Sequence, residues 1–405
     1  MPHTTRRWIH LAVGCVMMTL LGLVYAWSVF VAPLEKEFSW TRSQTSFTFT
    51  VSMIFFILGL IASGFLSNVL SKRKITLISA LCLLFGFFLC SRVSSLPGLY
   101  VAYGVLVGFG VGLANNALVS SIVKWFPEKT GLASGILMMG FGLGGLILSP
   151  LAVALMTSYG WRVTFLGFGL AFSLILAVGS LVVVMPPADF SVGSPAAAKK
   201  TVAVPVDVPI TGVLTAKSYW LYILWFAMIM AGGLLVIGHA SPYAVGLGAT
   251  PAFAAVATGM LSLSNGLGRV LTGVVFDKFG LKVSMFLMTF FLILASVLLI
   301  LSSVTGSLVL MLAGFLATGL SYGGGPPTSS TFAMTFYGPK YFSINYAALS
   351  AGMIPGALLG PMLAASLYAS SGGYMTSFVA MLVFAAPSLF FLWMIFKFGT
   401  KAKAK

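Results

Sequence analysis

The chain has 405 residues, of which 59% are hydrophobic and only 7% are charged. Soluble globular domains carry about 25% charged residues, so this composition excludes a soluble protein and predicts an integral membrane protein. The net charge of +16 comes from basic residues at the ends of apolar stretches, a pattern that reflects membrane topology and excludes a nucleic-acid-binding protein.

Apolar stretches of about 20 residues recur along the whole chain, and each is long enough to cross a bilayer as a helix. They predict an all-α integral membrane protein with twelve transmembrane helices. Alternation of period two is absent from the sequence, which excludes a transmembrane β-barrel. The expected spans are 8–31, 45–68, 75–93, 97–121, 130–155, 162–185, 218–240, 251–275, 282–303, 307–330, 342–368 and 374–397.

The distribution of Lys and Arg predicts how these spans are oriented. If both termini are cytoplasmic, seventeen of the 22 basic residues lie on the cytoplasmic side, and only Lys36, Arg42, Arg92 and Arg162 lie outside. Cytoplasmic loops of membrane proteins carry such an excess of basic residues. We therefore expect a multi-pass protein of the cell (inner) membrane with both termini in the cytoplasm.

Residues 189–216, rich in Pro, Val, Ala and Ser, predict a cytoplasmic linker between an N-terminal six-helix bundle at 1–188 and a C-terminal one at 217–405. The halves share a loop pattern, GFLSNVLSKRK at 64–74 and GVVFDKFGLK at 273–282. Each has a polar residue, Asn68 or Asp277, four positions after a glycine and then basic residues. Such an internal repeat is typical of secondary transporters.

Two polar features precede the eighth span. The adjacent amides Asn115 and Asn116 lie inside the fourth span, where one is expected to face a cavity and the other a neighbouring helix; the pattern leaves open which. His239 lies near the outer end of the seventh span. It could carry a proton, because histidine titrates near neutral pH, or it could simply be hydrogen-bonded in place.

The eighth span carries the main candidate site. Thr258, Ser262, Asn265, Arg269 and Thr272 are spaced four, three, four and three residues apart, so they share one helix face. All six acids of the chain lie in expected loops or at helix ends, outside this span. An ionised side chain inside a membrane costs at least about 2.5 kcal/mol, and an intramembrane arginine therefore suggests an anion-binding role.

Arg269 could alternatively extend to the cytoplasmic surface. Side chains lean toward the N-terminus of their helix, here toward the middle of the membrane, which favours binding over that alternative. The planar guanidinium can donate two parallel hydrogen bonds to a carboxylate. Asn265, one turn away, could orient it, bind a substrate hydroxyl or only join helices. In the tenth span, Tyr322 precedes the run GGGPP at 323–327, which predicts a broken or bent helix.

These features resemble the major facilitator superfamily, whose cytoplasmic loop pattern is matched by the second copy, with Asp277 and Lys278 as gating residues. The first copy departs from it at Asn68 and Ser71. Further segments are similar to the oxalate/formate antiporter family, which lies close to the monocarboxylate transporters. They are KWFPEKTGLASG at 124–135, GFGLG at 140–144, SPY at 241–243 and NGLGR at 265–269.

The resemblance implies two six-helix bundles, alternating access, and a substrate site that includes Tyr25 and Tyr322. Oxalate-exchanging relatives use a second intramembrane cation, a lysine of the eleventh span, together with tryptophans. Here Met353 stands at the lysine position, and Ser350 and Thr318 stand at tryptophan positions. A single cation favours a monoanion over a dianion, since a second carboxylate would stay buried and unpaired.

We therefore expect a monomeric secondary transporter of small monocarboxylates such as lactate or pyruvate, coupled to protons as a symporter. The alternative is a carboxylate exchanger without net proton movement. A membrane enzyme would need clustered acids, histidines or a metal site, whereas His3, His10 and His239 are dispersed. We expect no catalytic residues, metal or cofactor. A receptor on a transporter scaffold is a further alternative.

Overall fold

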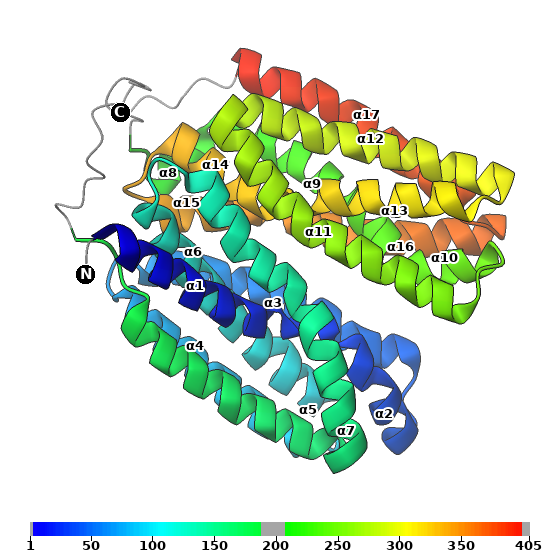
Figure 1. Cartoon of the computed structure of the whole chain (residues 1–405), viewed down its shortest axis with the longest axis horizontal. Coiled ribbons are helices and arrows are strands. Elements are labelled where there is room, and N and C mark those ends of the chain that lie inside the picture. The colour runs from blue at the N-terminus through cyan, green and yellow to red at the C-terminus, as the bar shows by residue number, and fades with distance from the viewer. Residues whose placement is uncertain (1–2, 188–206, 399–405) are drawn as a thin grey trace. The chain divides into compact units, whose positions relative to one another are not determined.

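The computed structural model describes residues 3–187 and 207–398, and every regular element in these ranges is a helix (Figure 1). This confirms the all-α prediction. The chain divides into two compact units, Met1–Lys199 (unit 1) and Lys200–Lys405 (unit 2). Of the expected linker, residues 189–206 lie outside the described part.

Unit 1 is built from long helices connected by short turns. Its helix α4 packs on α6 and α7, α1 packs on α7, and α3 packs on α6. Its elements are α1 (His3–Leu21), η1 (Gly22–Ala26), α2 (Ser28–Phe38), α3 (Arg42–Leu66), α4 (Lys72–Ser91), α5 (Leu96–Leu99), η2 (Tyr100–Val107), α6 (Gly108–Trp125) and α7 (Thr130–Val182).

In unit 2, α9 packs on α16 and α17, α12 packs on α17 and α13, and α13 packs on α11. Its elements are α8 (Ile210–Thr215), α9 (Lys217–Ile237), α10 (Ala240–Gly246), α11 (Pro251–Phe279), α12 (Leu281–Thr305), α13 (Leu308–Gly323), α14 (Gly325–Tyr337), α15 (Phe342–Ser350), α16 (Met353–Ser371) and α17 (Met375–Phe398).

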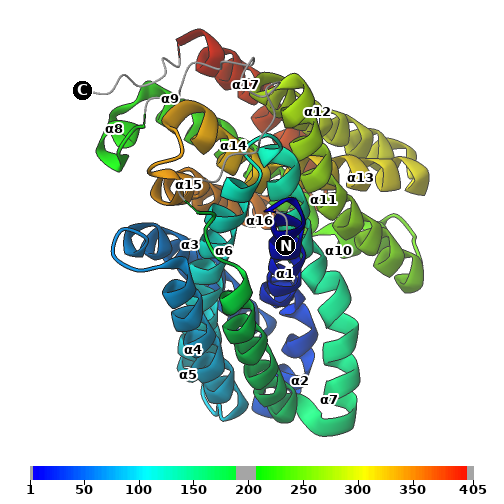
Figure 2. The same cartoon turned by 60° about the vertical axis from the view of Figure 1, so that its left-hand side comes forward.

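Ten helical segments in the described ranges are long and apolar enough to cross a membrane. One is α7, which reverses at Gly160, so that its second limb runs back in roughly the opposite direction and the two limbs correspond to two expected spans (Figure 2). Helix α11, with its polar stripe, is not among the ten but is 29 residues long. With both limbs of α7 and with α11, the helices are consistent with twelve spans.

Glycine makes two of the sharp reversals possible. Gly160, inside α7, has φ 78° and ψ 161°, and Gly280, between α11 and α12, has φ 83° and ψ 176°. Only glycine adopts this region without a large steric cost. At the matching position of the first loop, Ser71 has φ −66° and instead caps α4 by accepting a hydrogen bond from the Lys74 N–H. The two loop copies therefore turn differently.

Helices α11 and α13 touch through their backbones. A methyl group added to Gly323 would lie 2.0 Å from the Asn265 carbonyl oxygen, and one on Gly268 would lie 2.5 Å from the Leu320 carbonyl oxygen. Gly319 fits against the Ser264 and Leu261 turn in the same way. Small residues at such contacts let two membrane helices approach closely, so the α11–α13 seam fixes the position of the polar stripe on α11.

The segment that leads into unit 2 is held by the loop between α14 and α15. The Val208 N–H donates to the Tyr337 carbonyl at 3.0 Å, and Asn345 Nδ2 donates to the Val208 carbonyl at 2.9 Å. The Asp207 carboxylate accepts the Lys340 N–H at 2.9 Å. The end of the expected linker is thus docked on unit 2 rather than extended, and it continues into the short helix α8.

Candidate functional site

Arg269 lies inside α11, which starts at a regular N-cap. The Thr250 hydroxyl accepts a hydrogen bond from the Phe253 N–H at 3.2 Å, and Pro251 occupies the first helical turn. Arg269 is 1% exposed, and it is the only Asp, Glu, Lys or Arg among the buried side chains of the described residues. This burial argues against a side chain extended to the aqueous surface.

Helix α11 has two contrasting faces. At ~100° of rotation per residue, the exposed apolar side chains lie on one side of the helix. The polar stripe lies on the opposite side, with Arg269 and Thr272 buried and the others half-buried. Before the last turn of the helix, the exposed apolar side chains are Phe253, Val256, Leu263 and Leu267; Phe279, the exposed last residue, lies outside this face. An apolar face is suited to lipid, and a polar face turned away from it is suited to an aqueous route.

Asn265 contacts Arg269 directly. The Nε atom of Arg269 donates to the Asn265 Oδ1 atom at 3.4 Å, across one helical turn. The bond orients the plane of the guanidinium, whose Nη1–Nη2 edge is the one that matches the two oxygens of a carboxylate. Of the three roles considered for Asn265, this contact supports orientation of the arginine.

Tyr322 lies at the end of α13, where the predicted helix break is confirmed. Helix α13 ends at Gly323 and α14 begins at Gly325. Tyr322 is 4% exposed, and a methyl group on Gly233 of α9 would lie 2.7 Å from its Cδ2 atom. The ring therefore packs on α9.

His239 caps the junction of α9 and α10. Its Nε2 atom lies 3.4 Å from the Pro361 carbonyl oxygen, and its Nδ1 atom lies 3.3 Å from the Tyr374 hydroxyl. A neutral ring with its proton on Nε2 satisfies both contacts, since it donates to the carbonyl and accepts from the hydroxyl. These contacts hold His239 against Pro361 of α16 and against Tyr374, the residue before α17.

In unit 1, the two adjacent amides point to different helices. Asn116 donates from Nδ2 to the Leu60 carbonyl of α3 at 2.8 Å, and Asn115 Nδ2 lies 3.7 Å from the Met18 sulfur of α1. Asn116 is fully buried, and Asn115 is 4% exposed. The amide of Asn116 thus joins two helices, which leaves Asn115 as the stronger candidate for a cavity-facing residue.

Tyr25 lies in an interruption that the sequence did not predict. A single helix was expected over 8–31, whereas the structure has α1, the 3-10 segment η1 and then α2. The cause lies in packing against α7, where a methyl group on Gly22 would lie 2.2 Å from the Phe141 carbonyl oxygen. Tyr25 is half-buried, and its ring meets that of Phe141 edge-on at 5.3 Å.

The expected gating residues lie at the end of α11. Asp277 is half-buried and Lys278 is exposed, in the last turn before Gly280. In the first copy, Asn68 is exposed in the turn after α3, and Lys72 donates from Nζ to the Ser67 hydroxyl at 2.5 Å. In the first copy, Lys72 is therefore held by a hydrogen bond within its own loop, whereas Lys278 of the second copy is exposed.

The three positions at which the resemblance led us to expect a lysine or a tryptophan carry no charge. Met353 begins α16 and is 8% exposed. The hydroxyls of Ser350 and Thr318 donate to carbonyls of their own helices, those of Tyr346 and Gly314. Among the described residues, no three His, Cys, Asp or Glu side chains gather as metal ligands would.

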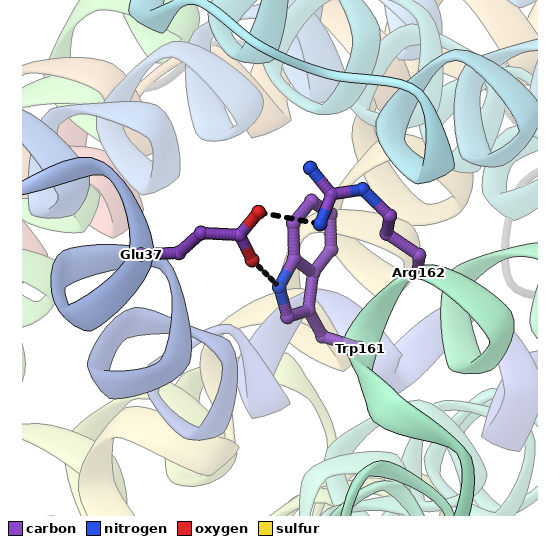
Figure 3. A network of polar contacts seen from close by, with 3 residues as sticks. All are labelled: Glu37, Trp161 and Arg162. Carbon is purple, nitrogen blue, oxygen red and sulfur yellow. Dashed lines mark hydrogen bonds and ion pairs between the residues drawn. The ribbon is translucent and has the colours of Figure 1, made fainter.

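One polar network was missed by the sequence reasoning. The Glu37 carboxylate, at the end of α2, accepts hydrogen bonds from Trp161 Nε1 at 2.7 Å and from Arg162 Nη1 at 2.5 Å (Figure 3). The Arg162 guanidinium also lies over the Trp161 ring, 4.2 Å from its centroid. The hydrogen bonds from Arg162 and then Trp161 lower the pKa of Glu37. Their separation of more than 120 residues hid this pairing from sequence reasoning.

The chain is similar to known proteins over most of its length. The family model of the Major Facilitator Superfamily matches residues 12–348 and 247–405. The oxalate:formate antiporter of Oxalobacter formigenes is 27% identical over 94% of this chain and 90% of its own length. Monocarboxylate transporter 13 of Rattus norvegicus is 24% identical over 89% of this chain and 82% of its own length.

A solved structure extends the comparison to the fold. The transporter FucP, in its outward conformation, superposes with a TM-score of 0.71 at 13% identity, over 98% of this chain and all of FucP. The relatives are transporters, and no catalytic family is indicated. The chain has the all-helical fold of these transporters and belongs to the Major Facilitator Superfamily.

Proposed function

We propose that this transporter carries small monocarboxylates such as lactate or pyruvate by alternating access, with Arg269 as the receptor for the substrate carboxylate. The observation that carries the proposal is a guanidinium 1% exposed on the polar face of a helix whose opposite face is apolar. A charge is retained inside a membrane protein at a cost of a few kcal/mol, which a role in binding an anion explains.

The expected contact is bidentate. Asn265 fixes the guanidinium through Nε, and the two Nη atoms donate in parallel to the two carboxylate oxygens. The binding of a monoanion neutralises the arginine, so the occupied site has no net charge. Tyr25, Asn115 and Tyr322 are the further residues for which we propose substrate contacts; for Asn116, the bond to α3 favours a packing role.

The proposed substrates carry a single charge, unlike oxalate, one of the two acids for which the relative from Oxalobacter formigenes is named. The protein of Oxalobacter formigenes is named for oxalate, a dianion, and formate, a monoanion. Met353, Ser350 and Thr318 offer no second positive charge in the described part of unit 2. A second carboxylate would be dehydrated there without a cationic partner, which supports monocarboxylates.

Proton coupling is the finer part of the proposal. An empty carrier with a buried positive charge reorients poorly, whereas the neutralised carrier reorients well. A proton that accompanies the substrate would then make transport a symport, with His239 as the candidate group. A carboxylate exchanger without net proton movement is the alternative, and the name of the relative from Oxalobacter formigenes favours it.

The membrane setting is proposed on the charge distribution. Seventeen of 22 basic residues fall on one side of the expected topology, which supports an inner-membrane protein with both termini in the cytoplasm. We further propose that residues 1–188 and 217–405 are the two bundles that move against each other, that Asp277 and Lys278 gate this motion, and that the transporter works as a monomer.

The test is uptake into liposomes that contain the purified protein, with labelled lactate, pyruvate, formate and oxalate, and with or without an inward proton gradient. Uptake of monocarboxylates driven by the gradient supports symport. Uptake only against preloaded carboxylate supports exchange. No uptake of any of the four acids would overturn the proposed substrate class.

A further inference from the structure

A second basic site lies in unit 1, far along the chain from α11. A cavity of about 370 Å³ opens between the start of α1 and the end of α7 and is lined by Arg6, Ile9, His10, Leu181 and Val182. In the proposed topology, this end of unit 1 faces the cytoplasm. The site involves none of the residues assigned to substrate binding.

His10 gives this cavity its polar character. The side chain is 2% exposed, and neither ring nitrogen makes a hydrogen bond of regular geometry with a described residue; the nearest backbone interaction is with Val182, which lines the same cavity. The ring stacks on Trp125, with 4.5 Å between the ring centroids and 29° between the planes. Trp125 is in turn held by a hydrogen bond of 2.7 Å from its Nε1 atom to the Val184 carbonyl. A buried polar group in a fixed position without a regular hydrogen bond calls for an explanation such as a ligand.

Arg6 and Arg7 are neighbours with different surroundings. Arg7 forms an ion pair with Glu128, and its guanidinium lies over the Phe126 ring at 5.0 Å from the centroid. Arg6 is exposed, lines the cavity and makes no ion pair with a described residue. The positive end of the α1 helix lies beside it and adds to the attraction for an anion.

The rim of the cavity is apolar. Leu181 is 55% exposed, Ile9 is 39% exposed, and the neighbouring Trp8 is 45% exposed. Exposed aliphatic side chains beside a tryptophan are typical of the level where lipid headgroups meet acyl chains. An anion bound to Arg6 and His10 would therefore lie next to the acyl chains of the bilayer on one side.

We propose that this cavity binds the phosphate of an anionic phospholipid. Arg6 forms the ion pair with the phosphate, His10 donates from a ring nitrogen to a phosphate oxygen, and an acyl chain follows Ile9 and Leu181. Basic pockets between helices on the cytoplasmic side of membrane proteins bind phospholipid headgroups by this chemistry. Free inorganic phosphate shares the polar part of the chemistry but not the apolar part.

The test is native mass spectrometry of the purified full chain with phosphatidylglycerol and with phosphatidylcholine of the same acyl chains. We expect preferential retention of phosphatidylglycerol by the unaltered protein. His10→Phe keeps a ring on Trp125 but removes both nitrogens, and Arg6→Gln removes the charge at an exposed position that does not endanger folding. Each should weaken phosphatidylglycerol binding about tenfold.

Arg73→Gln is the matched control, since Arg73 is exposed at the start of α4 and lies outside the cavity lining. It should leave lipid retention unchanged. Equal retention of both lipids, or undiminished retention by His10→Phe and Arg6→Gln, would overturn the proposal. Displacement of phosphatidylglycerol by millimolar inorganic phosphate would show a free-anion site and overturn the lipid assignment. The measurement does not involve transport, so its failure leaves the proposed function untouched.

Discussion

Helix α6 of unit 1 and helix α11 of unit 2 both contain polar residues within an apolar helix, but they place them differently. In α6, the two amides are adjacent in sequence and point to different neighbours, α3 and α1. In α11, the polar residues follow one face, and Asn265 contacts Arg269 on that face. Adjacent polar residues face different neighbours, so at most one of them can face a cavity, whereas polar residues at helical spacing build a continuous surface that suits a route for a ligand.

The sharpest test of this comparison is Arg269→Gln. We expect transport to fall by at least about 100-fold, because the amide can neither neutralise a carboxylate nor donate in parallel to both oxygens. Arg269→Lys should retain only a small part of the activity. Uptake in proteoliposomes measures the effect, and Arg92→Gln, at an exposed arginine, is the control. Normal transport by Arg269→Gln would refute the central role of α11.

The position of the polar face depends on the α11–α13 seam. Gly323→Ala should destabilise the protein by about 2 kcal/mol or lower its yield, because the added methyl group lies 2.0 Å from the Asn265 carbonyl oxygen. Gly259→Ala on α11 is the matched control, since nothing lies within 4 Å of its added methyl group. Thermal unfolding in detergent compares the two. Equal unfolding temperatures would mean that the seam is not tight.

A second positive charge, introduced at Met353, would test whether Arg269 is the single cation that binds the substrate. Met353→Lys should shift the preference from lactate toward oxalate by about tenfold, since a dianion then gains a partner for its second carboxylate. Competition by oxalate against labelled lactate uptake measures this shift. Met353→Gln, which adds polarity without charge, is the control. No gain in oxalate competition would count against the placement of residue 353 near the substrate.

Substitutions of Asn115 and Asn116 in α6 should differ in their effects on stability and on the KM of transport. Asn116→Leu removes the hydrogen bond to the Leu60 carbonyl and should cost about 1 kcal/mol of stability, with a smaller effect on the KM of transport. Asn115→Leu should raise KM with little change in the unfolding temperature. The opposite pattern, with KM sensitive to residue 116 alone, would reverse our assignment of the two side chains.

The smallest effect is expected at the surface. Because Arg162 and Trp161 lower the pKa of Glu37, the contribution of Glu37 to stability is present above its unfolded pKa, about 4.3. This contribution is lost as the pH falls through the lower folded value. Glu37→Gln should therefore reduce the loss of stability between pH 7 and pH 3. The exposed pair is expected to contribute little compared with the buried Arg269. An unchanged pH dependence would show that the ion pair does not form in solution.

The sequence was sufficient to predict those features that depend on the residues of a single helix. The stripe of α11, the break after Tyr322 and the all-α fold follow from spacing, from glycine and proline, and from apolar length. The 3-10 segment at Tyr25 and the π-helix over Tyr100–Val107 were not predicted, because contacts with other helices shape them. Glu37 was expected in a loop or at a helix end and Arg162 on the outer side, and their pairing was not predicted because it depends on how α2 meets the second limb of α7.

The glycine contacts between α11 and α13 have a mechanical consequence. With backbone against backbone at Gly268, Gly319 and Gly323, no layer of side chains remains that could slide or repack between the two helices. Any displacement of Arg269 along the transport cycle must therefore carry α13 with it. The break at Gly324, between α13 and α14, is the position where the backbone can change direction to allow that displacement. A movement of Arg269 is therefore coupled to a change in the angle between α13 and α14.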